Sequence, residues 1–302
     1  MAFRLAVLAS GSSGNSTLLE SDGFSVLIDA GLGPRQLASR LADVGATWQQ
    51  INAVVLTHTH SDHWRDRTLE HLRRMRIPLY CHAEHHDVLR SYSPAFPALA
   101  DTGLVRAFER DATLMLTPTL RCRPIEVRHD SEPTFAFRFE GTDGDLGRSW
   151  AVSYAADLGC WSAALAAVLA NADVLAIEFN HDEYLERSSR RPAELIERVL
   201  GDGGHLSNLQ AAELLQAILA AGDKCSPQHL VQLHLSRECN RPALAAAAAR
   251  RILGDEGSMA VHTSLQGRAG PILSLDASAA PYRAPARLRP AAIVQPCLPG
   301  ME

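Results

Sequence analysis

The chain has 302 residues, of which 46% are hydrophobic and 21% charged, and its formal net charge is −5. This ordinary globular usage excludes disorder over most of the length, and the small negative charge excludes a global electrostatic attraction to nucleic acid. No run of about 18 uninterrupted apolar residues is present, so we expect no transmembrane helix and no membrane partner. The six cysteines form no C-x-x-C pair, which favours reduced thiols and a cytoplasmic protein.

The first part of the chain predicts strands around one helix. Short apolar runs and period-2 alternation predict strands over residues 3–9, 16–20, 24–29 and 51–57. Residues 34–45 carry apolar positions near helical spacing, begin with proline and end with glycine, which are helix start and stop signals. The predicted order is strand, strand, strand, helix, strand.

Further along, strands give way to an alternation of strands and helices. Residues 66–90 predict polar helix around a short strand at 78–82, and further strands are expected over 120–129, 134–140 and 150–157. After these we expect a helix at 161–172, a strand at 173–179, helices at 191–201 and 206–222, and a strand at 228–236. This layout predicts the α/β class, with two mixed sheets face to face and helices outside.

We expect a single domain over residues 1–276, with two domains as the alternative. The length lies within the range of a large α/β sandwich. Residues 277–302 are rich in Ala, Pro and Arg and lack periodicity, which predicts a flexible tail.

The stretch "LTHTHSDHW", residues 56–64, concentrates metal-binding chemistry directly after an apolar strand. His58 and His60 are two positions apart, so beyond an extended strand they project to the same side, and a divalent ion fits between their imidazoles. Asp62 and His63 follow at a spacing that turns back toward the same ion or a neighbouring one. The alternative is a polar turn, but four ligand-type side chains in H-x-H-x-D-H order favour a metal site.

Other strands end on ligand-type residues as well. His129, Asp157 and His234 each lie where an apolar run stops, the position from which open α/β sheets usually present ligands. Taken singly, each of these residues has an alternative interpretation, as a capping residue or a hydrogen-bonded polar residue. Together with the first motif, they favour ligation.

The set His58-x-His60-x-Asp62-His63 with the three strand-end residues is similar to the five-motif ligand set of the metallo-β-lactamase fold superfamily. The shorter motifs "LASGSSGNSTLL", "EFNHD", "GHLSN" and "HLSRECN" resemble the YycJ/WalJ-type branch, although Cys239 stands where that branch has asparagine. The resemblance spans about residues 4–265. It implies the αββα four-layer sandwich of that superfamily.

The resemblance also implies two divalent metal ions, bridged by Asp157 and by a hydroxide that acts as nucleophile. It divides the other ligands into His58, His60 and His129 for one ion and Asp62, His63 and His234 for the other. Two ions about 3.5–4 Å apart lower the pKa of a shared water and clamp the attacking and leaving oxygens. Imidazole-rich ligation suits Zn, and a bridging carboxylate also accepts Mn or Fe.

Asp62, Glu178 and His205 are the predicted catalytic residues. By resemblance to ribonuclease Z, His205 would be the general acid for the leaving group, whereas the alternative is that it caps the following helix with Ser207 and Asn208. Glu178, at the end of another apolar run, is expected to hydrogen-bond His205 and hold its tautomer. A plain polar cluster at the strand end is its alternative.

Candidate substrate contacts lie in the turn 10–15 and in the shorter motifs. Backbone N–H groups of a Gly/Ser-rich turn can cradle a phosphate, although hairpin chemistry selects the same residues. The arginines after the metal motif and in "ERSSRR" (186–191) are candidate phosphate contacts or parts of a solvated helix face. The predicted substrate-binding residues are Ser13, Asn15, Asn180, His181, Ser207, Asn208, Ser236 and Asn240.

The resemblance implies a dinuclear-metal phosphodiester hydrolase that acts on nucleic acid as a DNA exonuclease. The fold alone does not specify this, because the same ligands serve lactam, thioester and lactone hydrolysis. The negative net charge and the absence of a separate nucleic-acid-binding domain count against it. A hydrolase of a small phosphodiester or ester metabolite is the first alternative, and a non-catalytic metal-binding regulatory partner is the second.

Overall fold

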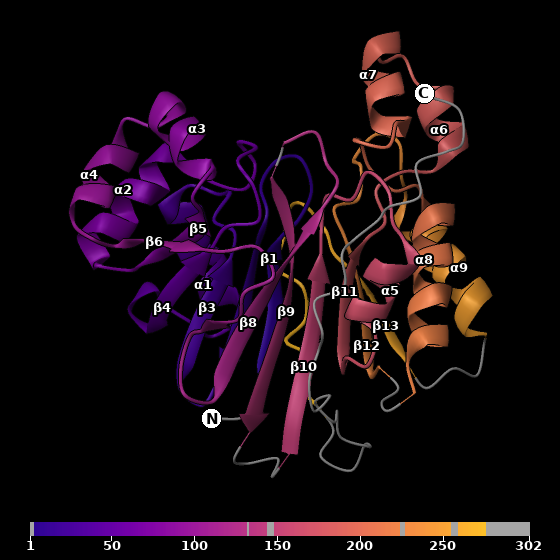
Figure 1. Cartoon of the computed structure of the whole chain (residues 1–302). Coiled ribbons are helices and arrows are strands. Elements are labelled where there is room, and N and C mark those ends of the chain that lie inside the picture. The colour runs from indigo at the N-terminus through magenta and orange to yellow at the C-terminus, as the bar shows by residue number, and fades with distance from the viewer. Residues whose placement is uncertain (1–2, 132, 144–147, 224–226, 255–258, 276–302) are drawn as a thin grey trace.

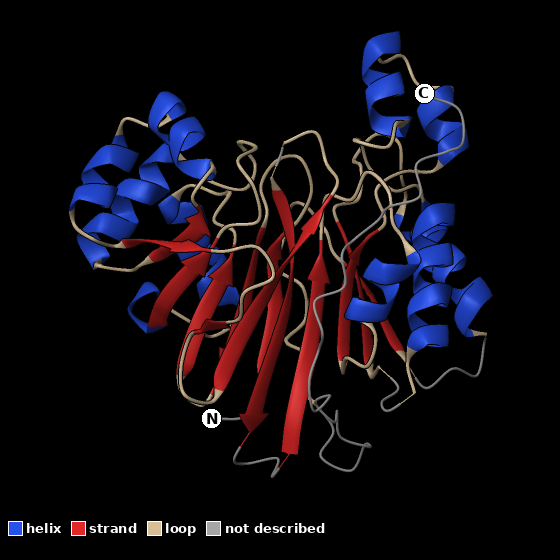
Figure 2. Cartoon of the chain, viewed as in Figure 1, coloured by secondary structure: helices blue, strands red, loops and turns tan. Residues whose placement is uncertain are grey.

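The computed structural model describes residues 3–131, 133–143, 148–223, 227–254 and 259–275 (Figure 1). The predicted tail, 277–302, lies outside these ranges. Within them, two mixed sheets lie face to face and helices cover both outer faces (Figure 2). The predicted αββα sandwich is therefore confirmed.

Among the described residues, the first sheet has six strands in chain order. β1 to β3 are antiparallel neighbours, and β3 to β6 are parallel. Because parallel strands end at the same edge, the loops after β3 and β4 are neighbours. The strands are β1 (Arg4–Ala9), β2 (Ser16–Ser21), β3 (Phe24–Ile28), β4 (Ile51–Val55), β5 (Leu79–His82) and β6 (Val105–Phe108).

The second sheet has the order β13-β12-β11-β10-β9-β8-β7. β8 and β10 both pair antiparallel with β9, and β10 to β13 are parallel, so β8, β10, β11 and β12 all end at one edge. The strands are β7 (Leu114–Met115), β8 (Leu120–Val127), β9 (Thr134–Asp143), β10 (Arg148–Ala155), β11 (Val174–Glu178), β12 (His229–Leu233) and β13 (Ala260–Thr263).

A buried apolar layer fills the space between the sheets. Along β9, Phe135, Phe137 and Phe139 pack into this layer with Trp150 of β10, while Ala136 packs on the opposite face, beneath the helices. The alternation follows from the pleat, which sends successive side chains to opposite faces of a strand.

Helices cover the outer faces of both sheets. None of those in the described part of the chain is long and apolar enough to cross a membrane. The first sheet is covered by α1 (Pro34–Asp43), the 3-10 turn η1 (Trp48–Gln50), α2 (Asp66–Met75), α3 (His85–Tyr92) and α4 (Ala95–Asp101). The second sheet is covered by α5 (Ala163–Leu169), α8 (Asn208–Ala221) and α9 (Pro242–Leu253), while α6 (Glu183–Arg187) and α7 (Ala193–Leu200) lie beyond the strand ends (Figure 1).

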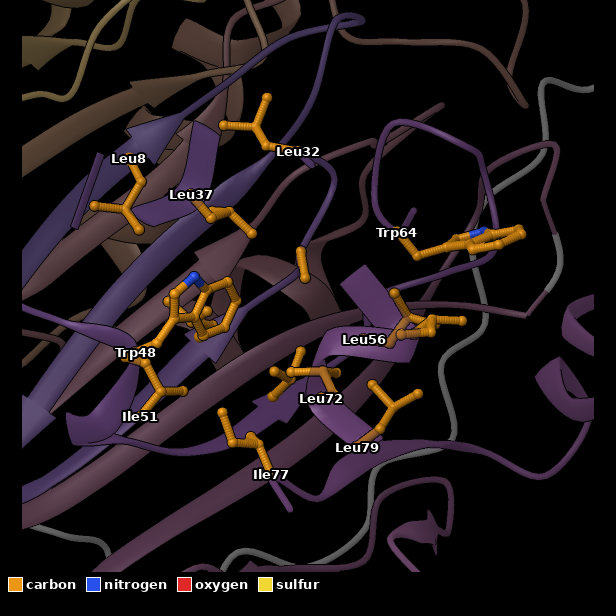
Figure 3. Packing of buried hydrophobic residues seen from close by; sticks show 14 of the residues in the cluster. Leu8, Leu32, Leu37, Trp48, Ile51, Leu56, Trp64, Leu72, Ile77 and Leu79 are labelled. Carbon is orange, nitrogen blue, oxygen red and sulfur yellow. The ribbon is translucent and has the colours of Figure 1, made fainter. Parts of the chain in front are cut away.

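The apolar cluster under the first helical layer also holds the loop after β4 (Figure 3). Leu37 of α1 and Leu72 of α2 are fully buried in it. Trp64 belongs to the same cluster, and its indole N–H donates to the Thr59 carbonyl at 2.8 Å. The loop that carries the H-x-H-x-D-H motif is thus packed at one end into the core.

Several elements were missed by the sequence analysis, namely α4, α6, α9, β6, β7 and β13. The buried face of α9 consists of Ala245 and Ala249, which are too small to give an apolar periodicity. β7 has two residues, and β13 lies partly exposed along its whole length. Such segments lack the period from which a sequence pattern is read.

Candidate metal centre

The predicted ligands converge from both sheets on one edge of the sandwich. The H-x-H-x-D-H residues follow β4, while His129, Asp157 and His234 follow β8, β10 and β12. A backbone hydrogen bond of 3.0 Å from Phe135 to Thr57 joins the sheets beside the motif. The convergence follows from the strand directions, because each of these strands ends at the same side.

Four sets of side chains place their ligand atoms within 4.8 Å of one another. Two of these sets, one with His60 and one with Asp62, are the two groups of ligands that the resemblance implies. Each of the other two sets contains Asp157. The role of these residues as ligands remains a prediction. The sets are His58, His60 and His129; Asp62, His63 and His234; His58, His63 and Asp157; and Asp157, Glu178, His205 and His234.

Two buried atoms in this cluster have no hydrogen-bond partner, and both are good ligands for a divalent cation. They are Nε2 of His58, which is fully buried, and Oδ2 of Asp157, which is 1% exposed. Buried polar groups are normally paired because an unpaired one costs about 1–3 kcal/mol. An imidazole nitrogen and a carboxylate oxygen in this position fit a bound divalent cation.

Asp29 positions the predicted ligand His63 and was missed by the sequence analysis. Its buried carboxylate accepts a 2.7 Å hydrogen bond from His63 Nδ1 and further bonds from the Thr57 amide and hydroxyl. With its proton on Nδ1, His63 presents Nε2 toward Asp157, whose Oδ2 lies 3.2 Å away. Asp29 ends the predicted strand 24–29, so the strand-end rule used for the other ligands would have found it.

Three strand-end residues of the site have left-handed backbone. Asp29, Asp157 and His234 have φ values of 62°, 56° and 55°. A residue other than glycine held in this region costs on the order of 1–3 kcal/mol, and such strain concentrates at functional sites.

The turn 10–15 holds the metal motif in place rather than offering free amides. The Asn15 amide donates to the Asp62 carbonyl at 2.7 Å, and the Gly14 and Gly11 amides are bonded within the turn. Asn15 Nδ2 lies 3.1 Å from Asp62 Oδ2 and 3.0 Å from His63 Nε2. These three amides are therefore bonded within the protein rather than free for a phosphate, and the Asn15 amide fixes Asp62.

Gly31 makes the same loops pack closely. A Cβ at this position would lie 1.7 Å from the Asp62 carbonyl oxygen and 2.7 Å from the Asn15 amide nitrogen. Any side chain here would push the motif loop and the turn apart.

The expected hydrogen bond between His205 and Glu178 is present, at 2.7 Å from Nδ1 to Oε1. The other carboxylate oxygen accepts from the Leu158 and Leu206 amides, so the fully buried Glu178 is fixed. Burial would raise the pKa of Glu178, but the charge of His205 and hydrogen bonds from His205 and His234 outweigh it and lower the pKa to about 2.

This shift predicts a pH-dependent stability difference between the metal-free protein and its Glu178→Gln variant. The pKa of Glu178 is lowered on folding, so its stabilisation is present above its ordinary pKa of 4.5 and is lost as the pH falls toward about 2. We expect the difference in unfolding free energy to shrink by about 2 kcal/mol between pH 6 and pH 3. Urea unfolding of both proteins measures it, and a difference that does not change with pH would contradict an ionised Glu178.

A pocket of about 380 Å³ opens beside the ligand sets. Of the predicted catalytic and substrate-binding residues, His205, Asn180 and Ser236 line it. In the turn 10–15, Ser12 lines the pocket, whereas the Ser13 hydroxyl donates to Gln266.

The other predicted substrate contacts are buried in a network that joins the loops after β11 and β12. Asn208 and Asn240 exchange side-chain hydrogen bonds of 2.9 and 3.0 Å, and Ser207 caps α8. His181 is 1% exposed, and its carbonyl accepts from the Asn208 amide. The structure thus places these four residues behind the pocket wall, and helix capping falls to Ser207 rather than to His205.

The arginines around the site divide into two groups. On the loop before α2 and on α2 itself, Arg65 donates to the Gly31 carbonyl and Arg73 pairs with Glu70, and neither lines the pocket. Arg191, from the second basic stretch, and Arg198 of α7 do line it. Arg198 was missed, because a basic residue on an amphipathic helix carries no signal of its own.

The sequence matches the family described as "Beta-lactamase superfamily domain" over residues 25–234. It is 31% identical over 243 residues to the exodeoxyribonuclease WalJ of Streptococcus pneumoniae serotype 2, covering 80% of this chain and 85% of that protein. It is 24% identical over 261 residues to the exodeoxyribonuclease YycJ of Bacillus anthracis, covering 85% and 91%. The structure of Zn²⁺-bound PqqB from Methylobacterium extorquens superposes with a TM-score of 0.62 at 17% identity, covering 90% and 100%.

The family match covers more than half of the chain, from β3 to His234, and so includes every predicted ligand. The resemblance to the superfamily and to the YycJ/WalJ-type proteins is confirmed by the family match and by these relatives. The chain therefore belongs to the beta-lactamase superfamily and is a metal-dependent hydrolase.

Proposed function

We propose that this protein hydrolyses phosphodiester bonds in DNA as an exonuclease, with two divalent metal ions as cofactors. The observation that carries the proposal is a pair of ligand sets on either side of Asp157, whose carboxylate lies 3.9 Å from His129 Nε2 and 3.2 Å from His63 Nε2, next to a pocket that His205 lines. The exodeoxyribonuclease relatives supply the substrate class, since the ligands alone serve several hydrolyses.

His58, His60 and His129 would hold one ion, and Asp62, His63 and His234 the other, with Asp157 between them. When bound, two such ions activate a water molecule and offset the charge that develops on the phosphate. Zn fits the imidazole-rich set, and Mn or Fe fits the carboxylates. Asp29 and Asn15 keep His63 and Asp62 in place.

His205 supplies the proton for the leaving oxygen in this proposal. The Glu178 carboxylate accepts from Nδ1, so the proton is delivered from Nε2. The same hydrogen bond fixes the orientation of the imidazole, and the two backbone amides hold the carboxylate still. Glu178 thus acts through His205 and positions it.

We place the protein in the cytoplasm. Among the described cysteines, Cys81, Cys122 and Cys239 are free thiols, as expected in a reducing compartment.

The test is degradation of an end-labelled linear duplex after removal of metal with EDTA. We expect no degradation without metal, and progressive loss from one end when Mn²⁺ or Zn²⁺ is returned. A covalently closed circle of the same sequence should stay intact, and so should the linear duplex with the Asp62→Ala variant. An intact linear duplex, with the protein shown to be metal-loaded and active on bis(p-nitrophenyl) phosphate, would favour a small phosphodiester substrate instead.

A further inference from the structure

The pocket beside the ligand sets has one basic wall, and that wall belongs to the segment between β11 and α8. The segment comprises α6, α7 and their connections, and it projects beyond the strand ends (Figure 1). His205 and His234 line the pocket on the side of the ligand sets, and Leu195 and Arg198 of α7 line it as well. A substrate that reaches the ligand sets therefore lies against α7.

The Arg191 side chain is fixed by ion pairs and hydrogen bonds within the protein, and it forms part of the basic wall. Its guanidinium bonds both oxygens of the fully buried Glu186 at 3.1 Å and also contacts Glu238 and the Ser236 hydroxyl. Two carboxylates thus offset its charge, and its role is to fix Ser236 at the pocket surface.

Arg198 is differently placed. Its side chain is 53% exposed, and Asp130 is the one carboxylate with which it forms an ion pair among the described residues. The Asp130 carboxylate lies 3.4 Å from His60 Nε2 and 3.3 Å from His129 Nε2. The Asp130 carboxylate therefore lies between the guanidinium and two predicted ligands, so the guanidinium is placed for a phosphate next to the one undergoing cleavage rather than for that phosphate itself.

The volume of the pocket limits what it can take. About 380 Å³ lies near the lower end of the range of roughly 300–1,000 Å³ for small-molecule sites, so it accommodates one nucleotide but not a duplex. If the phosphate being cleaved lies at the ligand sets, one nucleotide fills the pocket, and the next phosphate is the terminal one.

We propose that this pocket receives the terminal nucleotide of a DNA strand and that Arg198 binds its terminal phosphate. The inference rests on the proposed exonuclease function and assigns to it a site of end recognition. Arg198 exchanges Asp130 for the phosphate, because a guanidinium forms two parallel hydrogen bonds with either group. The Ser236 hydroxyl, held by Arg191, lies on the same surface as a further donor.

The experiment measures kcat and KM for metal-loaded protein on linear duplexes that differ only in a phosphate or a hydroxyl at the terminus, tested at the 5′ and the 3′ ends. At one of the two ends, we expect the KM of wild type to be roughly 10-fold lower for a terminal phosphate than for a terminal hydroxyl. One charge-assisted hydrogen-bonded pair provides a difference of this size. Arg198→Ala should lose this preference, so that KM becomes the same for phosphate and hydroxyl ends, and Arg198→Lys should keep part of it. Arg190→Ala is the matched control, because Arg190 is exposed on the same segment and does not line the pocket.

The possible failures are distinguishable. A wild type that degrades linear DNA with the same KM for phosphate and hydroxyl ends, or an Arg198→Ala variant that keeps the preference, overturns this inference and leaves the exonuclease function standing. A metal-loaded wild type that hydrolyses bis(p-nitrophenyl) phosphate but no linear DNA overturns the proposed function and the inference with it.

Discussion

Replacing Asp157 with asparagine is expected to remove at least one of the two metal ions and to lower the hydrolysis of linear DNA about 1,000-fold, since a metal ion contributes several kcal/mol of transition-state stabilisation. Asp157 Oδ1 lies 3.3 Å from His234 Nδ1, and Oδ2 lies 3.2 Å from His63 Nε2. Asparagine has the same shape but lacks the charge and one acceptor oxygen, so it cannot link the two ligand sets.

Elemental analysis of the purified protein gives the number of ions per chain, and end-labelled DNA gives the rate. Asp43→Asn is the matched control, because it makes the same chemical change on α1, where the Asp43 side chain is 50% exposed. An Asp157→Asn protein that keeps both ions and its rate would contradict the bridging role.

Replacing His205 with alanine is expected to lower kcat on DNA by roughly 10²–10⁴-fold, the usual contribution of a general acid. The leaving oxygen of a DNA strand is a poor leaving group and needs a proton, whereas p-nitrophenolate leaves without one. The variant should therefore lose much less activity on bis(p-nitrophenyl) phosphate. The ratio of the two losses is the measurement, and it separates proton delivery from metal binding, which both substrates require.

His71→Ala serves as control for this variant. His71 lies on α2 and packs against Trp48, away from the ligand sets. Equal losses of His205→Ala on both substrates would contradict a general acid and make His205 a ligand or a structural residue. A ligand role would be explained by the set in which His205 lies with Asp157, Glu178 and His234.

Local patterns in the sequence determined the strands and helices that position the site. The phenylalanines of β9 recur with period 2, and α1 shows helical spacing between proline and glycine, so both elements were predicted close to their bounds. Short or small-residue elements such as α9 and β13 were missed, because alanine and half-exposed positions leave no apolar period. The H-x-H-x-D-H motif could also be recognised from the local sequence, since all its members lie within one loop.

The strand ends and the family resemblance predicted which distant residues join that loop, but only the tertiary structure decided how close together their side chains lie. Asp62 and His234 are 172 positions apart, yet their side chains lie 3.4 Å from each other. The reason is topological, because strands from two sheets end at one edge and no local spacing encodes that. The pairing of Asp29 with His63, the capping of α8 by Ser207 and the position of Arg198 beside Asp130 have the same origin. Sequence by itself determined the family and the residue types of the predicted ligands, and the packing of the two sheets decided the geometry of these residues and the wall of the pocket.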